Sequence, residues 1–159
     1  MVHPLTVSPH VPTDLYEQLQ QFYARHMHAG DSGDIGAWAA CFTEDAVFAS
    51  NGLPHPLRGR AAIEATARLG AADRAERAAT HRHLVTMLDV HRDHSGAPED
   101  ADASVVARSY VLVVESAAGG KASLHLSAVC EDTLVRGDGR WLVRERRVTR
   151  DDLPAAPAA

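Results

Sequence analysis

The pattern of apolar and polar positions divides the chain into a helical first part and a strand-rich second part. Large apolar side chains recur at helical spacing from Thr13 to about Gly30, with Thr13 as the expected N-cap and Asp14 near the positive end of the helix dipole. A second, shorter helix is expected over residues 35–42. A third is expected over residues 60–78, which are rich in good helix formers.

From Thr80 onward, β-branched runs alternate with turn sequences. The pattern predicts four long strands, at 80–92, 104–116, 121–136 and 140–150, with glycine turns at 119–120 and 137–139. A brief strand is also expected at 46–50, before the turn sequence Asn51 to Pro54. Because the helices precede an antiparallel sheet, the sequence predicts an α+β fold in which three N-terminal helices pack on a strongly curved, mainly antiparallel sheet.

The length of 159 residues fits one domain with its own core, expected over residues 13–152. The flanking segments 1–12 and 153–159 are rich in proline and hold few large apolar side chains. Burial cannot offset the entropy of ordering such segments, so we expect both to be disordered.

Charge and cysteine content exclude some classes of protein. The 16 Lys and Arg residues against 21 Asp and Glu residues give a formal net charge of −5, which argues against a nucleic-acid or anionic-membrane partner. No apolar run is long enough to span a bilayer, and residues 1–13 carry three prolines, so we expect a soluble, cytoplasmic protein. Cys41 and Cys130 lie in apolar stretches without metal-ligand spacing, and we expect two free thiols.

Two short polar segments are the strongest candidates for chemistry. Asp31 follows the first predicted helix, and His83 lies at the start of the first long strand. A carboxylate and an imidazole at element ends can converge on a cavity as a general acid/base pair near neutral pH. The alternatives are that Asp31 only caps the break between two helices and that His83 is a core histidine bonded to a backbone carbonyl. Asp34 is interpreted as the N-cap of the second helix.

Polar residues on the long strands have two interpretations. Tyr110, His125 and Ser127 contact a substrate if their side chains face a cavity, and are ordinary surface residues if they face outward. The charged run 144–147 is interpreted as a solvated edge or as intersubunit ion pairs.

A metal site is a further alternative on the same strands. His81 and His83 share one face of a strand and can hold zinc if a third ligand arrives, for which His125 is the candidate. Because this arrangement needs several coincidences and lacks cysteine ligands, we expect no metal.

The order and spacing of several short segments resemble the nuclear transport factor 2-like superfamily, and more narrowly its SnoaL-like and scytalone-dehydratase-like branch. The resemblance covers about residues 13–152 and rests on Tyr23 before Asp31, Asp34 before Trp38, Phe42-Thr-Glu-Asp45, Arg58-Gly59-Arg60-Ala-Ala-Ile63, Arg82-His83, and Gly139-Arg-Trp141 before Arg146-Arg-Val148. It implies a cone-shaped α+β barrel with a deep pocket for a small, largely apolar or aromatic molecule, in a homodimer.

Small proteins of this branch often act without a cofactor as cyclases, dehydratases or isomerases in aromatic polyketide pathways. By position, Asp31 and His83 match the catalytic carboxylate and histidine of the dehydratase-like members, and Tyr23 and Trp38 are expected at the substrate. Scytalone dehydratase has a tyrosine where this chain has Gly30, and its second histidine falls near Ser109-Tyr110.

Together these features predict a cofactor-independent lyase or isomerase that acts on an aromatic polyketide-type intermediate in secondary metabolism, for example in antibiotic biosynthesis. The alternative is a non-catalytic subunit that binds a small molecule or docks a pathway enzyme.

Overall fold

The computed structural model describes residues 11–93 and 104–154, which form three helices and six strands. Their order is α1 (Thr13–Asp31), α2 (Ile35–Ala39), β1 (Phe42–Ser50), β2 (Leu57–Arg58), α3 (Arg60–Glu76), β3 (Ala79–Arg92), β4 (Ser104–Ala117), β5 (Ser123–Gly137) and β6 (Arg140–Arg150). The segments expected to be disordered, 1–12 and 153–159, lie mostly outside the described residues. No helix in the described part of the chain has the length and apolar character to cross a membrane.

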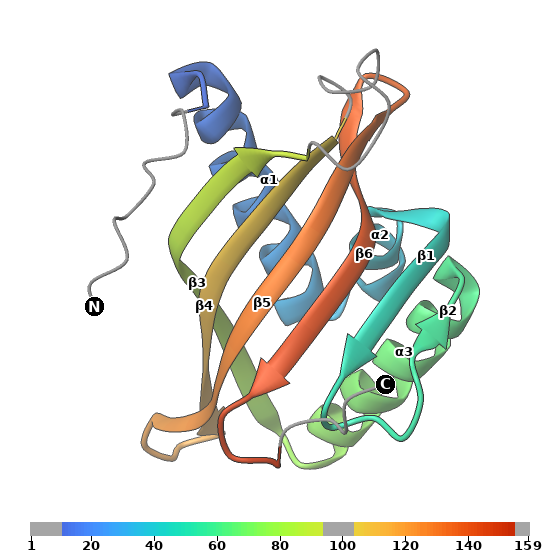
Figure 1. Cartoon of the computed structure of the whole chain (residues 1–159). Coiled ribbons are helices and arrows are strands. Elements are labelled where there is room, and N and C mark those ends of the chain that lie inside the picture. The colour runs from blue at the N-terminus through green and yellow to red at the C-terminus, as the bar shows by residue number, and fades with distance from the viewer. Residues whose placement is uncertain (1–10, 94–103, 155–159) are drawn as a thin grey trace.

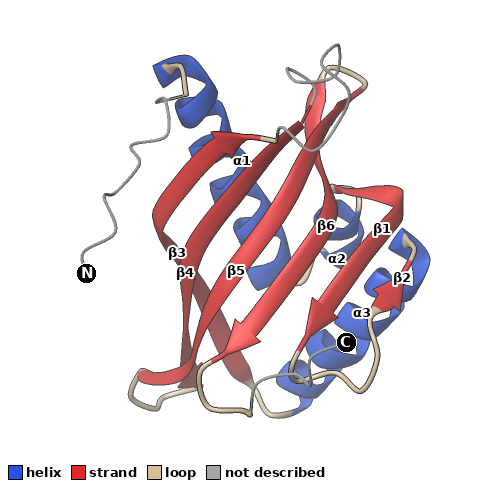
Figure 2. Cartoon of the chain, viewed as in Figure 1, coloured by secondary structure: helices blue, strands red, loops and turns tan. Residues whose placement is uncertain are grey.

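The strands form one mixed sheet in the order β2-β1-β6-β5-β4-β3. β1 pairs in parallel with β6, and the other neighbouring strands are antiparallel. The sheet curves around the helices, which all lie on one of its faces, and it does not close into a barrel (Figures 1 and 2). The predicted α+β class, with helices over a curved and mainly antiparallel sheet, is therefore confirmed.

Most of the predicted elements match the observed ones, and the main error lies at the second helix. That helix ends at Ala39, and Phe42 begins β1 instead, because it pairs with Val143 of β6 and is fully buried. β2 was missed, since two residues carry no periodic signal. Asp34 caps α2 as expected, and its Oδ1 accepts a hydrogen bond of 3.0 Å from the backbone N–H of Ala37.

The first helix begins slightly differently from the prediction. Thr13 is the first helical residue, and Pro12 occupies the N-cap position without a side-chain hydrogen bond. Proline tolerates this place because the first N–H groups of a helix have no partner within it.

The core lies between the helices and the concave face of the sheet. α1 contributes Leu19, Tyr23 and Met27, and α3 contributes Ile63. The strands complete this cluster with Phe42, Ala46, Val90, Val105, Ala107, Leu134, Trp141 and Val143. A main core shared by helices and strands in this way is typical of a single domain.

Several strand pairs contain register shifts, and two of the β-bulges decide the direction of particular side chains. Thr133 pairs with Glu145 and Leu134 with Val143, so β6 carries Arg144 as an extra residue between them. A bulge reverses the alternation of faces, and Val143 and Arg146 are consequently both buried on the concave side. A second bulge lies between β4 and β5, where His125 is the extra residue of β5.

Candidate functional site

The structure brings Asp31 and His83 into direct contact. Asp31 ends α1, and its Oδ1 lies 2.6 Å from Nδ1 of His83 on β3. The other oxygen, Oδ2, accepts a hydrogen bond of 2.9 Å from the backbone N–H of His83. The carboxylate therefore holds both the backbone and the ring of His83, 52 residues further along the chain.

These contacts lower the pKa of Asp31. Burial alone raises the pKa of Asp31, but the side-chain and backbone hydrogen bonds from His83 outweigh it and hold this pKa below its ordinary value. An ionised Asp31 accepts a hydrogen bond from the protonated Nδ1 of His83, and in the neutral form of the ring the lone pair then lies at Nε2. Nε2 has no hydrogen-bond partner among residues 11–93 and 104–154 and is free to meet a ligand.

His83 lines a cavity of about 270 Å³ between the helices and the concave face of the sheet. Helical residues form one side of it: Met27, Gly30, Ile35, Trp38, Ala67, Gly70 and Arg74. Strand residues form the other: Phe48, His83, Val111, Val113, Leu126, Ala128, Cys130, Arg146 and Val148. The wall is thus largely apolar, with basic groups at His83, Arg74 and Arg146.

Gly30 is required for the shape of this cavity. A Cβ atom at this position would lie 2.9 Å from Cδ1 of Trp38, closer than real Cβ atoms approach their neighbours. The absent side chain lets the indole of Trp38 pack directly on α1. The ring of Trp38 thus occupies the space that a side chain at position 30 would need.

A buried polar network supports the floor of the cavity. Arg146 is 4% exposed and forms two hydrogen bonds to Asp132, from Nε to Oδ1 at 2.8 Å and from Nη2 to Oδ2 at 2.7 Å. Burial alone lowers the pKa of Arg146, but the adjacent carboxylate outweighs it and the pKa lies above its ordinary value. The guanidinium is therefore a permanent positive charge at the cavity wall.

His26 completes this network as a neutral ring. Arg146 Nη1 lies 2.9 Å from His26 Nε2, which must accept because a guanidinium has no lone pair to offer. Burial, and then the charge of Arg146, hold the pKa of His26 well below its ordinary value. Its Nδ1 carries the proton and has no hydrogen-bond partner in the described part of the chain.

Four of the expected substrate contacts lie elsewhere. Tyr23 is buried, and its hydroxyl donates a 2.8 Å hydrogen bond to Asp132, so it belongs to the network beneath this cavity. Together with His83 it also lines a second hollow, of about 930 Å³, between α1 and β3. Burial and the charge of Asp132 raise the pKa of Tyr23 well above its ordinary value. Tyr110 is 51% exposed because it alternates with the inward-facing Val111, and it lies on the outer face of the sheet.

Ser127 and His125 are also outside the cavity. Ser127 alternates with Leu126 and Ala128, both in the cavity wall, and its hydroxyl donates a 2.6 Å hydrogen bond to Asp151. The side chain of His125 is 43% exposed and lies near Glu115. Of the five expected substrate contacts, Trp38 alone lines the cavity.

Arg146, Arg74 and Asp132 were missed by the sequence analysis. The interpretation of run 144–147 as a solvated edge is wrong for Arg146, because the bulge at Arg144 turns its side chain inward. A signal existed at Asp132, which stands two residues from the apolar Cys130 and two from Leu134. A carboxylate at an inward-facing strand position requires a buried positive partner.

Comparisons with known proteins agree with this architecture. The SnoaL-like domain family matches residues 12–147. Aln2 from a Streptomyces species is 34% identical, with a TM-score of 0.78 over 89% of this chain and 94% of its own. ActVI-ORFA from Streptomyces coelicolor is 32% identical, with a TM-score of 0.79 over 91% of this chain and 100% of its own.

A protein from Catenulispora acidiphila, solved in complex with S-DNPA, is 34% identical, with a TM-score of 0.73 over 89% of this chain and 96% of its own. None of the curated proteins matches the chain in sequence. The family match covers most of the chain, and the three solved structures share its fold. The chain therefore belongs to the SnoaL-like family, within the nuclear transport factor 2-like superfamily.

Proposed function

We propose that this protein is a cofactor-independent lyase or isomerase that cyclises or dehydrates an aromatic polyketide-type intermediate. The observation that carries the proposal is the 2.6 Å contact between Asp31 Oδ1 and His83 Nδ1, beside a largely apolar cavity. A positioned imidazole and carboxylate are sufficient for general acid/base chemistry.

The proposed proton transfer uses Nε2 of His83. This nitrogen removes a proton from the carbon next to a substrate carbonyl, and Asp31 stabilises the imidazolium that forms. The imidazolium then gives the proton to the departing hydroxyl group in a dehydration, or to carbon or oxygen of the enolate in an isomerisation or cyclisation. His83 ends each cycle in its initial state.

Arg146 is proposed to stabilise the enolate oxygen. Three of the five N–H bonds of a guanidinium are engaged, by Asp132 and His26, which leaves two for a ligand. A fixed positive charge in a water-poor site stabilises developing negative charge strongly. Arg146 thus supplies a polar contact to the substrate, which the sequence suggested for Tyr110, His125 or Ser127.

The size and lining of the cavity support a substrate of fused aromatic rings. Its volume of about 270 Å³ is well above the roughly 150 Å³ of an apolar cavity that accepts one benzene molecule. Arg74 and Arg146 favour a substrate that carries phenolate, enolate or carboxylate oxygens. The S-DNPA complex of the Catenulispora acidiphila relative supports a binding role for the same fold.

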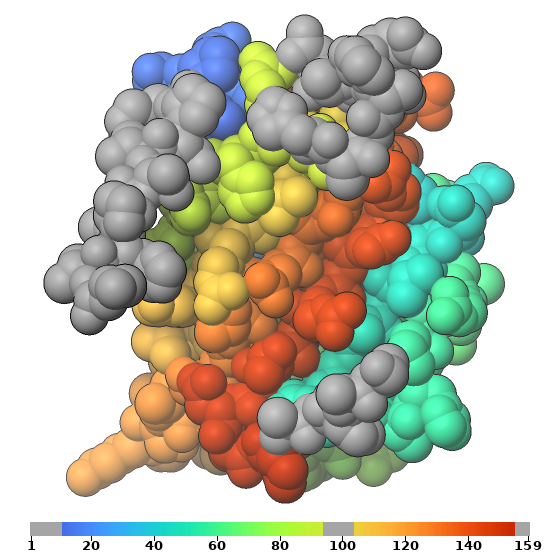
Figure 3. Space-filling model, viewed as in Figure 1, coloured from blue at the N-terminus to red at the C-terminus, as the bar shows by residue number. Residues whose placement is uncertain are grey.

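We further propose a homodimer that packs through the outer face of the sheet. This face carries exposed apolar side chains at Leu84, Tyr110 and Leu124, which are 46%, 51% and 63% exposed. Figure 3 views the outer face, where side chains of β4, β5 and β6 lie at the surface without a covering helix. Exposed apolar area of this kind is typical of an interface.

The acid/base proposal is tested with an aryl β-hydroxy ketone as the probe. Its turnover is followed as loss of water and as deuterium uptake from solvent next to the carbonyl. His83→Ala and Asp31→Asn are each expected to reduce turnover by roughly 10²-fold, the usual scale for a positioned acid/base group. The double variant should be little worse than either single one, because the two residues act as one unit.

His55→Ala is the matched control, since His55 is an exposed histidine in the turn between β1 and β2. It should retain wild-type turnover. If His83→Ala keeps near-wild-type turnover with an unchanged circular dichroism spectrum, the catalytic assignment is wrong. The non-catalytic, ligand-binding interpretation then replaces it.

A further inference from the structure

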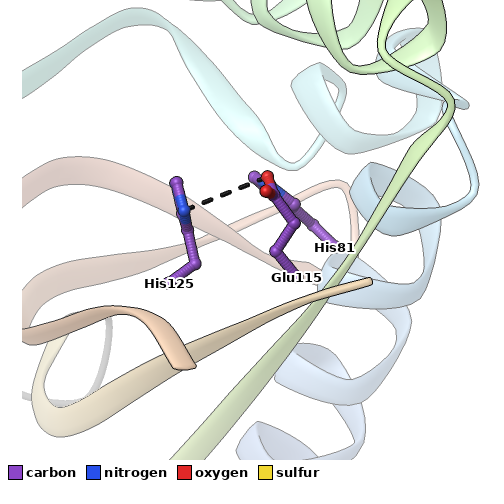
Figure 4. Close-up of side chains that lie close together, drawn as sticks. All are labelled: His81, Glu115 and His125. Carbon is purple, nitrogen blue, oxygen red and sulfur yellow. Dashed lines mark hydrogen bonds and ion pairs between the residues drawn. The ribbon is translucent and has the colours of Figure 1, made fainter. Parts of the chain in front are cut away.

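Three neighbouring strands bring His81, Glu115 and His125 together, outside the cavity lining. His81 on β3 pairs directly with Glu115 on β4 in the sheet register. His125 is the extra residue of the β5 bulge, which directs its side chain toward Glu115. Figure 4 shows the three side chains converging on one point from their separate strands.

The distances suit a small cation. His81 Nε2 lies 2.7 Å and His125 Nδ1 lies 3.9 Å from Glu115 Oε2, and the candidate ligand atoms of the three residues all lie within 4.8 Å of one another. Ligand atoms on a tetrahedral zinc ion, with bonds of about 2.0–2.2 Å, stand ~3.3 Å apart. Small rotations of the side chains therefore bring all three onto one ion.

A cation already lies beside the carboxylate of Glu115. Arg77 Nη1 lies 3.2 Å from Glu115 Oε2 and is the cation with which a metal ion has to compete.

We propose that His81, Glu115 and His125 form a Zn²⁺ site at this end of the sheet. Two imidazoles and one carboxylate favour zinc over magnesium or calcium, which prefer oxygen ligands. Three protein ligands leave a fourth position for water, and the 43% exposure of His125 gives the ion a path from solvent.

The sequence predicts no metal, because a site of His81, His83 and His125 needs several coincidences and lacks cysteine ligands. The structure separates His83 from this set, since Asp31 engages its Nδ1, and supplies Glu115 from β4 in its place. The proposed zinc site is therefore distinct from the acid/base pair and does not depend on the proposed activity.

The test titrates Zn²⁺ into the untagged, metal-free full chain in competition with a chromogenic zinc chelator. One equivalent is expected to bind, with no response to Mg²⁺. His125→Ala and Glu115→Gln should each weaken binding by at least about tenfold, since loss of even an outer-shell partner costs about 10–100-fold. His55→Ala, the exposed histidine far from this cluster, should bind as the wild type does.

A variant that is expected to strengthen zinc binding makes the test more specific. Arg77→Gln removes the competing cation from Glu115 and should tighten zinc binding. Co²⁺ gives a second readout, because its visible absorption reports imidazole coordination and should be lost in His125→Ala. The proposal is overturned if the wild type binds no Zn²⁺, if His125→Ala and Glu115→Gln bind it unchanged, or if Arg77→Gln fails to tighten it.

Discussion

The buried pair of Asp132 and Arg146 offers the strongest test of how this fold tolerates charge in its interior. In the variant Asp132→Asn, an amide of nearly the same shape replaces the carboxylate. The native carboxylate accepts two hydrogen bonds from Arg146, at 2.8 and 2.7 Å, and a third from Tyr23 at 2.8 Å. An amide has one acceptor oxygen, and its NH₂ group would face the N–H and O–H donors of Arg146 and Tyr23, from which it cannot accept a hydrogen bond. The variant leaves the guanidinium with its charge but without a counter-charge.

The expected cost is large because both side chains are excluded from water. Asp132 is 1% and Arg146 is 4% exposed. Removing one partner of such a pair costs about 3–5 kcal/mol, out of a total stability of about 5–15 kcal/mol for a domain. With a urea m-value of about 2 kcal/mol per M, the unfolding midpoint should fall by roughly 1.5–2.5 M.

An exposed ion pair on the same strand provides the control. Glu131 accepts a 3.0 Å hydrogen bond from Arg108, with side chains 43% and 51% exposed. Glu131→Gln should therefore cost less than about 1 kcal/mol. If Asp132→Asn lowers the free energy of unfolding by no more than this control does, burial does not make the pair costly to break.

A double-mutant cycle with Arg146→Met completes the test. Each single change leaves one buried group without its partner, whereas the double variant removes both charges. The free energies of the two single changes should therefore sum to well above that of the double variant. Additivity within about 0.5 kcal/mol would refute the reasoning.

Three further outcomes are expected. Gly30→Ala places a Cβ atom 2.9 Å from Trp38, and this overpacking costs about 1–3 kcal/mol. The cost should outweigh the gain in helix propensity of about 1 kcal/mol, so the variant should be less stable than the wild type. A raised melting temperature would contradict this expectation. Because the pKa of His26 is lowered in the folded protein, the unfolded state takes up this proton at a higher pH than the folded state does. The free energy of unfolding should therefore decrease below about pH 6.5, by up to ~1.4 kcal/mol per pH unit. Urea titrations of His26→Gln should show a smaller decrease over the same pH range. Light scattering should find a dimer at micromolar concentration, and Tyr110→Lys, on the outer sheet face, should shift it toward monomer.

The fold was predictable from the sequence because its elements carry strong local signals. The Asp138-Gly139 turn, with φ of 51° and 74°, joins β5 to β6 where the turn sequence predicted a hairpin. Phe42 was assigned to the second helix instead of β1, because its spacing from Ile35 and Trp38 fits a helical pattern as well as a strand start. Its pairing with Val143, about a hundred residues away, decides the outcome, and local periodicity cannot reveal such pairing.

The candidate site was predictable where residues lie at element ends and not where strands are irregular. Asp31 and His83 meet as the segment ends suggested. Arg146 was hidden because the bulge at Arg144 reverses the faces of β6, and alternation counted from Trp141 places it outward. Glu115 was missed for a related reason, since its partners come together only through the register of three strands.

The second hydrogen bond of Asp31 has a consequence for solubility. β3 is one of the two edge strands of the described sheet, and its backbone N–H at His83 would otherwise be open to pairing with another chain. The carboxylate occupies that donor and places a negative charge beside the strand, which opposes strand addition. Loss of the Asp31 side chain therefore removes the partner that orients the imidazole, and it also leaves an unpaired N–H on an edge strand. Variants at Asp31 are consequently expected to aggregate more readily than variants at His83.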